Sequence, residues 1–236
     1  MTQQATHKPI CLITGCSGTI GSYIAQHLIS QNWRVWGITR KIENTKMQPE
    51  INWLIGDLMD PEKHLEIIKK LTQQGSFDAI IHCLGFSPDY SLLNMEPAHF
   101  QQALILNFSS IQKINQALIP YLNRSSTIIH LGSRVAKMGN PGQIAYSTAK
   151  GILADYTKIL ASELGKNDIT VNMILPGVHA SDMLGANHQQ VMENAKKASL
   201  LNRLTAIEDV ANAVQFLLNA RTITGQIFPI ESRLIE

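Results

Sequence analysis

Three side chains in the second half of the chain have the types and spacing needed for proton transfer at a carbonyl group. In YSTAK, Tyr146 and Lys150 stand four positions apart within a helical pattern, so they share one helix face a turn apart. A free tyrosine has a pKa of about 10, and a neighbouring ammonium makes it a better acid–base group by stabilising the phenolate. Ser133 closes the β-rich run that comes before, and its hydroxyl can hold a carbonyl oxygen beside the phenol.

Asn107 is a fourth candidate, inside a long central helical segment, where it can bind a water that relays protons to Lys150. A lone YxxxK pattern is commonly just a pair on a helix surface. We favour the catalytic interpretation because Ser133, Tyr146 and Lys150 occur together, behind the glycine-rich turn considered next. They also follow predicted parallel strands, whose carboxyl ends are where such folds bind ligands.

The glycine-rich turn is TGCSGTIG, residues 14–21, between an apolar run and an amphipathic run. Glycines at 15, 18 and 21 let a backbone approach a pyrophosphate, and a following helix directs its free N–H groups at that anion. Ser17 and Thr19 add hydroxyl donors. A purely structural turn is the alternative, but the position between strand and helix favours dinucleotide binding. The expected set includes Gly15, Ser17, Gly18, Thr19, Ile20 and Gly21.

The end of the second predicted strand indicates which dinucleotide is bound. An acidic residue there would hold the ribose hydroxyls of NAD, but the chain has Thr39 and Arg40 in GITRK. A guanidinium pairs with a 2′-phosphate that a carboxylate would repel, so NADP(H) is favoured. The alternative is that Arg40 is only a surface arginine.

The sequence GDLMD, residues 56–60, follows the third predicted strand. Asp57 can accept a hydrogen bond from an adenine amino group, with the Leu58 backbone beside the ring. Asp57 can also cap the turn into the next helix, and the two roles are compatible.

Strand-like and helical segments alternate along the whole chain. Strands are predicted at 10–14, 34–39, 51–56, 78–85, 127–133, 170–176 and 226–231, and helices at 18–31, 61–74, 97–122, 144–165, 187–198 and 207–219. This order predicts an α/β, doubly wound parallel sheet in a single domain, with a flexible N-terminus over 1–8. Asp60 before Pro61 predicts one helix cap, and Thr205 with Glu208 predicts a capping box.

Composition excludes several other classes of protein. The net charge is +2 with only short basic clusters, so nucleic-acid binding is not expected. Three cysteines without a CxxC spacing, and eight histidines without HExxH, predict neither a disulfide framework nor a metal site. No apolar run has the roughly 18 residues of a membrane span. We expect a cytoplasmic protein without a membrane partner.

Together these motifs, with ILPG at 174–177, resemble the short-chain dehydrogenase/reductase family over essentially the whole chain. The second half, from MGNPGQIAYSTAK to ITGQIFPIE, is similar to 3-oxoacyl-[acyl-carrier-protein] reductases, as is GFSPDYSLLNM at 85–95. The resemblance implies a seven-stranded Rossmann-like sheet and hydride transfer between NADP(H) and a carbonyl or alcohol. It also implies a homotetramer or homodimer.

By position, the resemblance implies a role for each site residue. Tyr146 would donate the proton, Lys150 would lower its pKa and bind the nicotinamide ribose, Ser133 would orient the carbonyl and Asn107 would support the relay. Pro176 and Gly177 would approach the nicotinamide, and Ser181 would lie near its carboxamide or near the pyrophosphate. Gly85, after the fourth strand, would also bind the cofactor.

The chain departs from the family pattern in three places. Thr19 stands where the usual turn has a glycine, a form that resembles the branch acting on sugar nucleotides. HCLG at 82–85 replaces the usual NNAG, so we expect His82 to be a packed or hydrogen-bonded substitute rather than a catalyst. The usual acid-Gly-Gly near the C-terminus is replaced by residues 231–233, ESR, which predicts altered subunit packing.

The leading hypothesis is the NADPH-dependent reduction of a 3-oxoacyl thioester, linked to acyl carrier protein or to CoA. Residues 178–203 would form a substrate lid, and Arg124 would meet the carrier protein or else be a solvated arginine. A non-acyl ketone, such as a polyketide, steroid or sugar-like compound, is the main alternative substrate. A sugar-nucleotide epimerase or dehydratase and a non-catalytic NADP-binding protein are further alternatives. The former lacks its substrate domain here, and the latter would not need Ser133, Tyr146 and Lys150.

Overall fold

A computed structural model describes residues 8–41, 43, 48–181 and 188–234. Its centre is one sheet of seven parallel strands in the order β3-β2-β1-β4-β5-β6-β7, which confirms the predicted doubly wound α/β fold. The strands are β1 Ile10–Thr14, β2 Arg34–Thr39, β3 Asn52–Ile55, β4 Phe77–His82, β5 Leu122–Leu131, β6 Thr170–Pro176 and β7 Ile227–Ile230. The flexible segment predicted at 1–8 lies outside the described residues except for Lys8.

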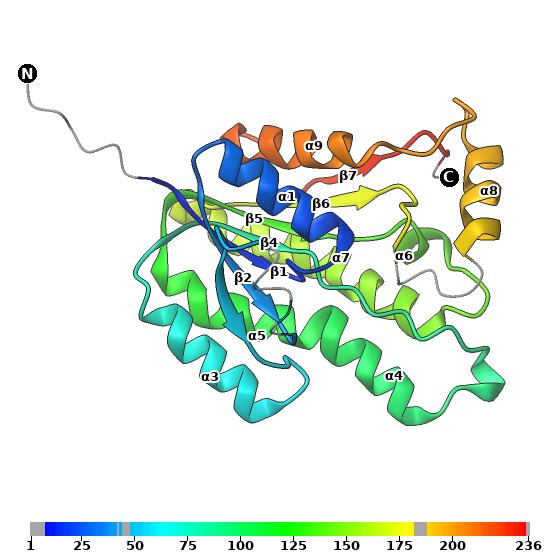
Figure 1. Cartoon of the computed structure of the whole chain (residues 1–236), viewed down its shortest axis with the longest axis horizontal. Helices are drawn as coiled ribbons and strands as arrows, with labels where there is room; N and C mark the ends of the chain where they lie inside the picture. Colours follow the sequence, from blue (N-terminus) through cyan, green and yellow to red (C-terminus); the bar gives the residue numbers. More distant parts are fainter. Residues whose placement is uncertain (1–7, 42, 44–47, 182–187, 235–236) are drawn as a thin grey trace, which may run out of the picture.

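Helices cover both faces of the sheet, with α1 and α9 on one side and α3, α4 and α5 on the other (Figure 1). Their bounds are α1 Thr19–Ser30, α3 Pro61–Thr72, α4 Pro97–Leu104, α5 Ser110–Leu118, α6 Val135–Met138, α7 Ile144–Leu164, α8 His188–Ala198 and α9 Ile207–Asn219. Shorter helical turns are η1 Leu92–Asn94, η2 Ile105–Ser109, η3 Ile119–Tyr121 and η4 Gly165–Asn167. None of the described helices has the length and apolar character that crossing a bilayer requires.

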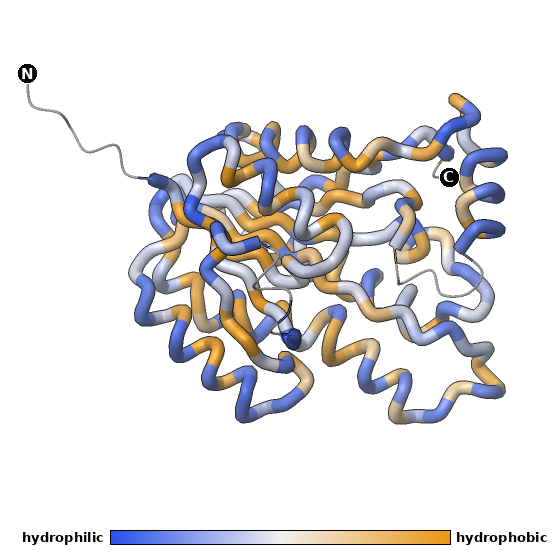
Figure 2. Tube along the Cα trace, viewed as in Figure 1, coloured by the Kyte–Doolittle hydropathy of each residue, from blue (hydrophilic) through white to orange (hydrophobic). Residues whose placement is uncertain are grey.

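The two apolar layers follow from the alternation of side chains along each strand. In β1, Cys11 and Ile13 pack in the cluster that contains Ile24 and Leu28 of α1. Ile10 and Leu12 point the other way, into the cluster that contains residues of α3, α5 and α7. Because both faces are buried, the strands are apolar without alternation, and they form the apolar centre of the molecule in Figure 2.

The structure confirms one of the two predicted helix caps and contradicts the other. Asp60 caps α3, since its side chain accepts from the backbone N–H of Glu62 at 2.9 Å and of Lys63 at 3.2 Å. The capping box at Thr205 is wrong, because α9 has Ala206 at its N-cap and no side-chain cap bond. Glu208 instead accepts a hydrogen bond from the Tyr23 hydroxyl at 3.0 Å, which ties α9 to α1.

The predicted helix at 97–122 is interrupted. It divides into α4, a π-helical turn at η2, α5 and the short turn η3, after which β5 begins at Leu122, five residues earlier than predicted. The order of the strands matters for the site because it reverses direction between β1 and β4. In doubly wound sheets such a reversal opens a crevice at the carboxyl ends of the strands.

Candidate active site

One cavity of about 800 Å³ opens at the carboxyl ends of the strands, a size typical of ligand pockets. It brings together all but one of the residues that the sequence assigns to the site: Gly15, Ser17, Gly18, Thr19, Ile20, Gly21, Thr39, Arg40, Asp57, Leu58, Gly85, Ser133, Tyr146, Lys150, Pro176, Gly177 and Ser181. The exception is Asn107, which is fully buried behind the wall of the cavity.

The glycine-rich turn forms one end of this cavity and brings the backbone closer than a side chain would allow. Gly15 has φ +67°, and a Cβ added there would lie 2.7 Å from the carbonyl oxygen of Cys83. A Cβ on Gly21 would lie 2.3 Å from the carbonyl oxygen of Gly15. Helix α1 begins at Thr19 with no side-chain cap bond, so its N-terminal N–H groups are available to an anion.

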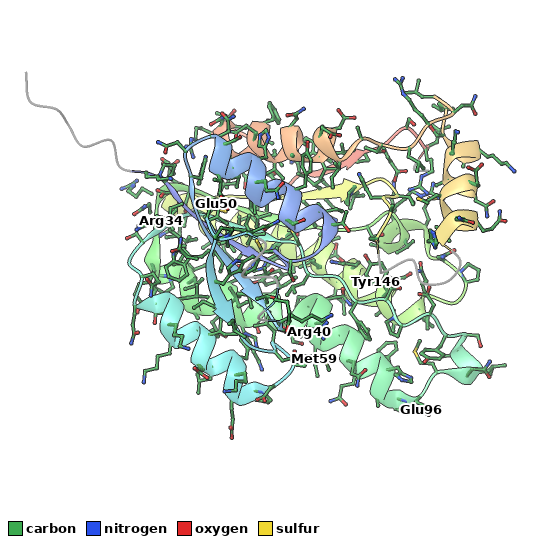
Figure 3. The ribbon with its side chains drawn as sticks, in the orientation of Figure 1. Arg34, Arg40, Glu50, Met59, Glu96 and Tyr146 are labelled. Carbon is green, nitrogen blue, oxygen red and sulfur yellow. The ribbon has the colours of Figure 1, made fainter. Side chains whose placement is uncertain are left out.

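The end of β2 supplies the cation next to this turn. Thr39 is buried and Arg40 is exposed, and both line the cavity. Figure 3 shows Arg40 at one end of β2 and Arg34 at the other, with Arg40 toward the end of the molecule that holds Tyr146. The guanidinium is therefore at the cavity, in a position suited to a phosphate.

Asp57 serves as a turn residue, because its Oδ1 accepts from the backbone N–H of Met59 at 2.9 Å. Leu58 beside it is buried, and both residues line the cavity. The structural role foreseen for Asp57 is thus present, and its contact with an adenine stays a prediction.

Tyr146 and Lys150 come from one face of α7 and are 8% and 1% exposed. The Lys150 Nζ lies 5.8 Å from the centre of the Tyr146 ring and donates to the carbonyl oxygens of Leu84 at 2.8 Å and Leu131 at 2.9 Å. These two bonds fix the ammonium between the ends of β4 and β5. The lysine can therefore act at a defined point of the cavity without rearranging.

Burial changes the acidity of both groups. Desolvation raises the pKa of Tyr146 to about 12, while a side-chain hydrogen bond with Ser133 acts in the opposite direction. Desolvation lowers the pKa of Lys150 to about 8. At neutral pH the pair is therefore a neutral phenol beside an ammonium, the state in which tyrosine can donate a proton.

Asn107 sits in the π-helical turn and braces the cavity wall from behind. Its Oδ1 accepts from the backbone N–H of Phe86 at 3.0 Å, and its Nδ2 donates to the carbonyl oxygens of Phe86 at 2.7 Å and Ala103 at 2.9 Å. Phe86 lines the cavity, so Asn107 positions the loop after β4. Its part in a proton relay stays a prediction.

The end of β6 closes the cavity from the other side. A Cβ on Gly177 would lie 2.2 Å from the Thr205 Oγ1, so a side chain there would require Thr205 to move. The His179 Nδ1 donates to the Gly177 carbonyl at 2.7 Å and orders the turn that leads to Ser181. Within the segment predicted to be a lid, 178–203, residues 182–187 lie outside the described part. Seven of the described residues line the cavity: Val178, His179, Ser181, Val191, Asn194, Ala195 and Ala198.

Sequence reasoning missed a buried polar network beneath the cavity, whose proton positions can be deduced from one end. The Thr157 hydroxyl donates to the Leu153 carbonyl at 2.7 Å, so it must accept from His130 Nδ1 at 2.8 Å. The Nε2 of His130 is then unprotonated and accepts from Asn115 Nδ2 at 3.3 Å. Asn115 Oδ1 in turn accepts from His82 Nε2 at 2.8 Å.

His82 completes the network at the glycine-rich turn, because its Nδ1 accepts from the Thr14 Oγ1 at 3.1 Å. Burial lowers the pKa of His82 to about 4, so the ring is neutral in this arrangement. The expectation that His82 is a hydrogen-bonded substitute in HCLG is confirmed. Its partner His130 was detectable too, because each histidine directly follows a pair of buried isoleucines at or near the end of its strand.

Comparison with known proteins gives concordant results. The family model described as enoyl-(acyl carrier protein) reductase matches residues 15–232. The chain is 32% identical to the 3-oxoacyl-[acyl-carrier-protein] reductase FabG of Staphylococcus epidermidis, over 91% of this chain and 94% of that protein. It is 29% identical to FabG of Escherichia coli, over 92% and 93%.

A solved structure resembles the whole fold. The Pseudomonas aeruginosa RhlG/NADP active-site complex superposes with a TM-score of 0.86 at 25% sequence identity, covering 95% of each chain.

Proposed function

The chain belongs to the short-chain dehydrogenase/reductase family, whose members are NAD(P)-dependent oxidoreductases of carbonyl and hydroxyl groups, and we propose that it reduces 3-oxoacyl thioesters with NADPH. The observation that carries this proposal is the convergence of Ser133, Tyr146 and Lys150 in the cavity that also holds the glycine-rich turn. The family relationship, shown by the comparisons above, supports an acyl substrate.

The cavity residues fit a nicotinamide dinucleotide. The backbone at Gly15 and Gly21 leaves no room for side chains, and the uncapped N-terminus of α1 suits a pyrophosphate. Arg40 at the cavity would pair with the 2′-phosphate of NADPH, Asp57 and Leu58 would face the adenine, and the loop from Pro176 would lie along the nicotinamide. When bound, NADPH supplies a hydride to the carbonyl carbon.

The side chains of this chain would manage the oxygen and its proton. Ser133 would hold the carbonyl oxygen and Tyr146 would protonate it, which gives the hydroxyl of a 3-hydroxyacyl thioester. Lys150 would stabilise the resulting phenolate from its position beside the ring. Asn107 would support this by fixing Phe86 and the loop that carries it.

The hydroxyl groups of Tyr146 and Ser133 distinguish between two possible reductions, that of a carbon–carbon double bond and that of a carbonyl group. The description of the family model names an enoyl substrate, in which a carbon–carbon double bond would be reduced. The names of the FabG relatives give a 3-oxoacyl substrate, in which a carbonyl group would be reduced. A phenol and a hydroxyl that share a hydrogen bond at the cavity are suited to hold and protonate an oxygen. We therefore assign the reduction to the carbonyl group.

The acyl part would enter beside α8, in the segment predicted to be a lid. The apolar residues that line the cavity include Phe86, Val135, Met138, Val178 and Val191. Arg124 is exposed near the start of β5, at the other end of the strand from Ser133, a separation of up to about 30 Å along the strand. A contact between Arg124 and a carrier protein would thus lie away from the cavity of the same chain, and it stays a prediction, as do a cytoplasmic location and a homodimer or homotetramer.

The test is to follow NADPH absorbance with acetoacetyl-CoA and with acetoacetyl-acyl carrier protein. We expect oxidation of NADPH with at least one thioester and much slower oxidation of NADH. Failure of both thioesters, with turnover of a non-acyl ketone in the same assay, would transfer the assignment to the alternative substrate class.

A further inference from the structure

The loop after β4 and the loop before α7 are joined by a cluster of polar side chains at the cavity. Asp89 Oδ1 accepts from the Ser87 hydroxyl at 2.7 Å and from Gln143 Nε2 at 3.1 Å, and Gln143 Nε2 also approaches the Ser87 Oγ at 3.2 Å. Asn140 Nδ2 donates to Gln143 Oε1 at 2.9 Å. We call these four residues the Asp89 clasp, and all four line the cavity.

The clasp is attached directly to the helix that carries the proton donor. Gln143 is the N-cap of α7, its carbonyl accepts from the backbone N–H of Ser147 at 2.8 Å, and Tyr146 lies in that first turn. A backbone bridge between Tyr90 and Gln143 adds a second link between the two loops. The position of the Asp89 carboxylate relative to the Tyr146 helix is therefore fixed by both side chain and backbone.

The carboxylate of Asp89 has a distinct place among the charges of the cavity. Tyr146 faces Lys150 on its own helix, and the other basic residues that line the described part of the cavity are Arg40 at the end of β2 and Arg134, His179 and Arg233 at the ends of β5, β6 and β7. Arg233 is paired with Glu231, and Arg134 donates to the Leu234 carbonyl at 3.1 Å. Of the two acids that line the cavity in the described chain, Asp57 belongs to the β3 end.

Electrostatics agrees with this placement. Besides burial, the negative charge of Asp89 raises the pKa of Tyr146, whereas the hydrogen bond with Ser133 lowers it. Asp89 is exposed, so its effect is screened by solvent and is smaller than that of burial.

We propose that Asp89 is a positioning residue for proton transfer, a negative charge that the clasp holds at the cavity so that Tyr146 stays protonated for reduction. The proposal rests on the function proposed above, since it concerns the same phenol. With Asp89 present the resting tyrosine would remain a proton donor to higher pH. Without it, the phenol would lose a neighbouring negative charge and would ionise more readily.

The experiment is the pH profile of kcat/KM for wild type and Asp89→Asn, measured in both the reducing and the oxidising direction. The amide can still accept from Ser87 and Gln143, so the clasp is retained while the charge is removed. We expect the ionisation assigned to Tyr146 to shift to lower pH by roughly half a unit in both directions. Asp89→Ser, which also lacks the charge, must shift it the same way.

Asp155→Asn is the matched control, because Asp155 is an exposed acid on the same helix, paired with Lys158 and away from the cavity. Unchanged profiles in both Asp89 variants, or an equal shift in the control, would overturn the proposal. Ultraviolet titration of tyrosine ionisation in the NADP-bound protein, with Tyr146→Phe to identify the signal, needs no substrate. It therefore tests Asp89 even if no thioester is reduced, and an ionisation unmoved by Asp89→Asn counts against the proposal.

Discussion

Burial has opposite effects on the pKa values of the two ionisable residues that α7 brings to the cavity. It raises the pKa of Tyr146 to about 12 and lowers that of Lys150 to about 8, because in each case the charged form loses its hydration. As pH rises, the lysine is thus the first of the two to change charge in the protein alone. In the proposed reduction Tyr146 would give its proton to the substrate oxygen, so the charges near the phenol affect how readily the proton is transferred.

Tyr146→Phe should separate the proton donor from the binding site. We expect turnover to fall by about 10²- to 10⁴-fold, the usual contribution of a general acid, with NADPH affinity nearly unchanged because the ring is kept. Steady-state kinetics and a fluorescence titration of NADPH measure the two quantities. Tyr121→Phe, at a position 41% exposed outside the cavity, is the control. Turnover close to wild type in Tyr146→Phe would refute the role.

Arg40→Ala should change which cofactor is preferred. Charged hydrogen bonds to a phosphate contribute about 1.5–3 kcal/mol, so we expect NADPH affinity to fall by roughly 10- to 100-fold while NADH affinity stays within a factor of about three. Isothermal titration with both cofactors measures this. Arg34→Ala, at the opposite end of β2, should leave both affinities unchanged. An unaltered NADPH affinity in Arg40→Ala would mean that the 2′-phosphate is held elsewhere.

At the scale of elements, the close approach of α1 to the turn after β1 depends on one glycine. In Gly21→Ala the new Cβ would meet the backbone carbonyl of Gly15 at 2.3 Å, so helix and turn must separate. We expect a loss of about 1–3 kcal/mol of unfolding free energy and at least a tenfold loss of NADPH affinity.

Gly151→Ala is the matched control, since it lies inside α7 with its nearest neighbouring atom at 3.7 Å. This substitution should be neutral or should stabilise the protein by up to about 1 kcal/mol, because alanine is the better helix former. Urea denaturation of both variants gives the comparison. Equal stability of the two variants would show that the close approach at Gly21 is dispensable.

The same elements show how far local sequence patterns predict this structure. The bounds of β1, β2, β6 and α9 agree with the prediction because apolar runs and helical periods end there at clear boundaries. The break in the helix at 97–122 was not predictable from a local pattern, since Asn107 in the π-helical turn bonds to the backbone of Phe86 in another loop. Likewise, the early start of β5 involves an irregular register against β4 near Phe77.

The candidate site was also predicted only in part from local sequence patterns. Cavity-lining residues were predicted where backbone chemistry gives a pattern, as at the glycine-rich turn and in YSTAK. The Asp89 clasp and the histidine network were missed because they connect residues that lie far apart in the sequence, such as His82 and Asn115. Only the folded sheet brings these partners within hydrogen-bonding distance.

At the scale of the whole molecule, the histidine network connects β1, β4 and β5 with α5 and α7 through Thr14, His82, Asn115, His130 and Thr157. All five residues are completely buried, so each bond replaces hydration that folding removes. The proton positions deduced above require both histidines to be neutral. Acid should therefore destabilise the fold through this network.

The whole-molecule prediction is that replacing His82 reduces the sensitivity of the fold to acid. Folding lowers the pKa of His82 from its ordinary 6.5 to about 4. Between these two values the imidazole is protonated in the unfolded chain but not in the folded chain, so the free energy of unfolding decreases as the pH is lowered. Between pH 7 and pH 5 this costs the wild type about 2 kcal/mol, a loss that His82→Asn should not show even if it is less stable at pH 7. Urea denaturation at both pH values measures the difference, with His188→Asn, an exposed site on α8, as the control. An equal loss in wild type and His82→Asn would mean that His82 does not titrate as the network requires.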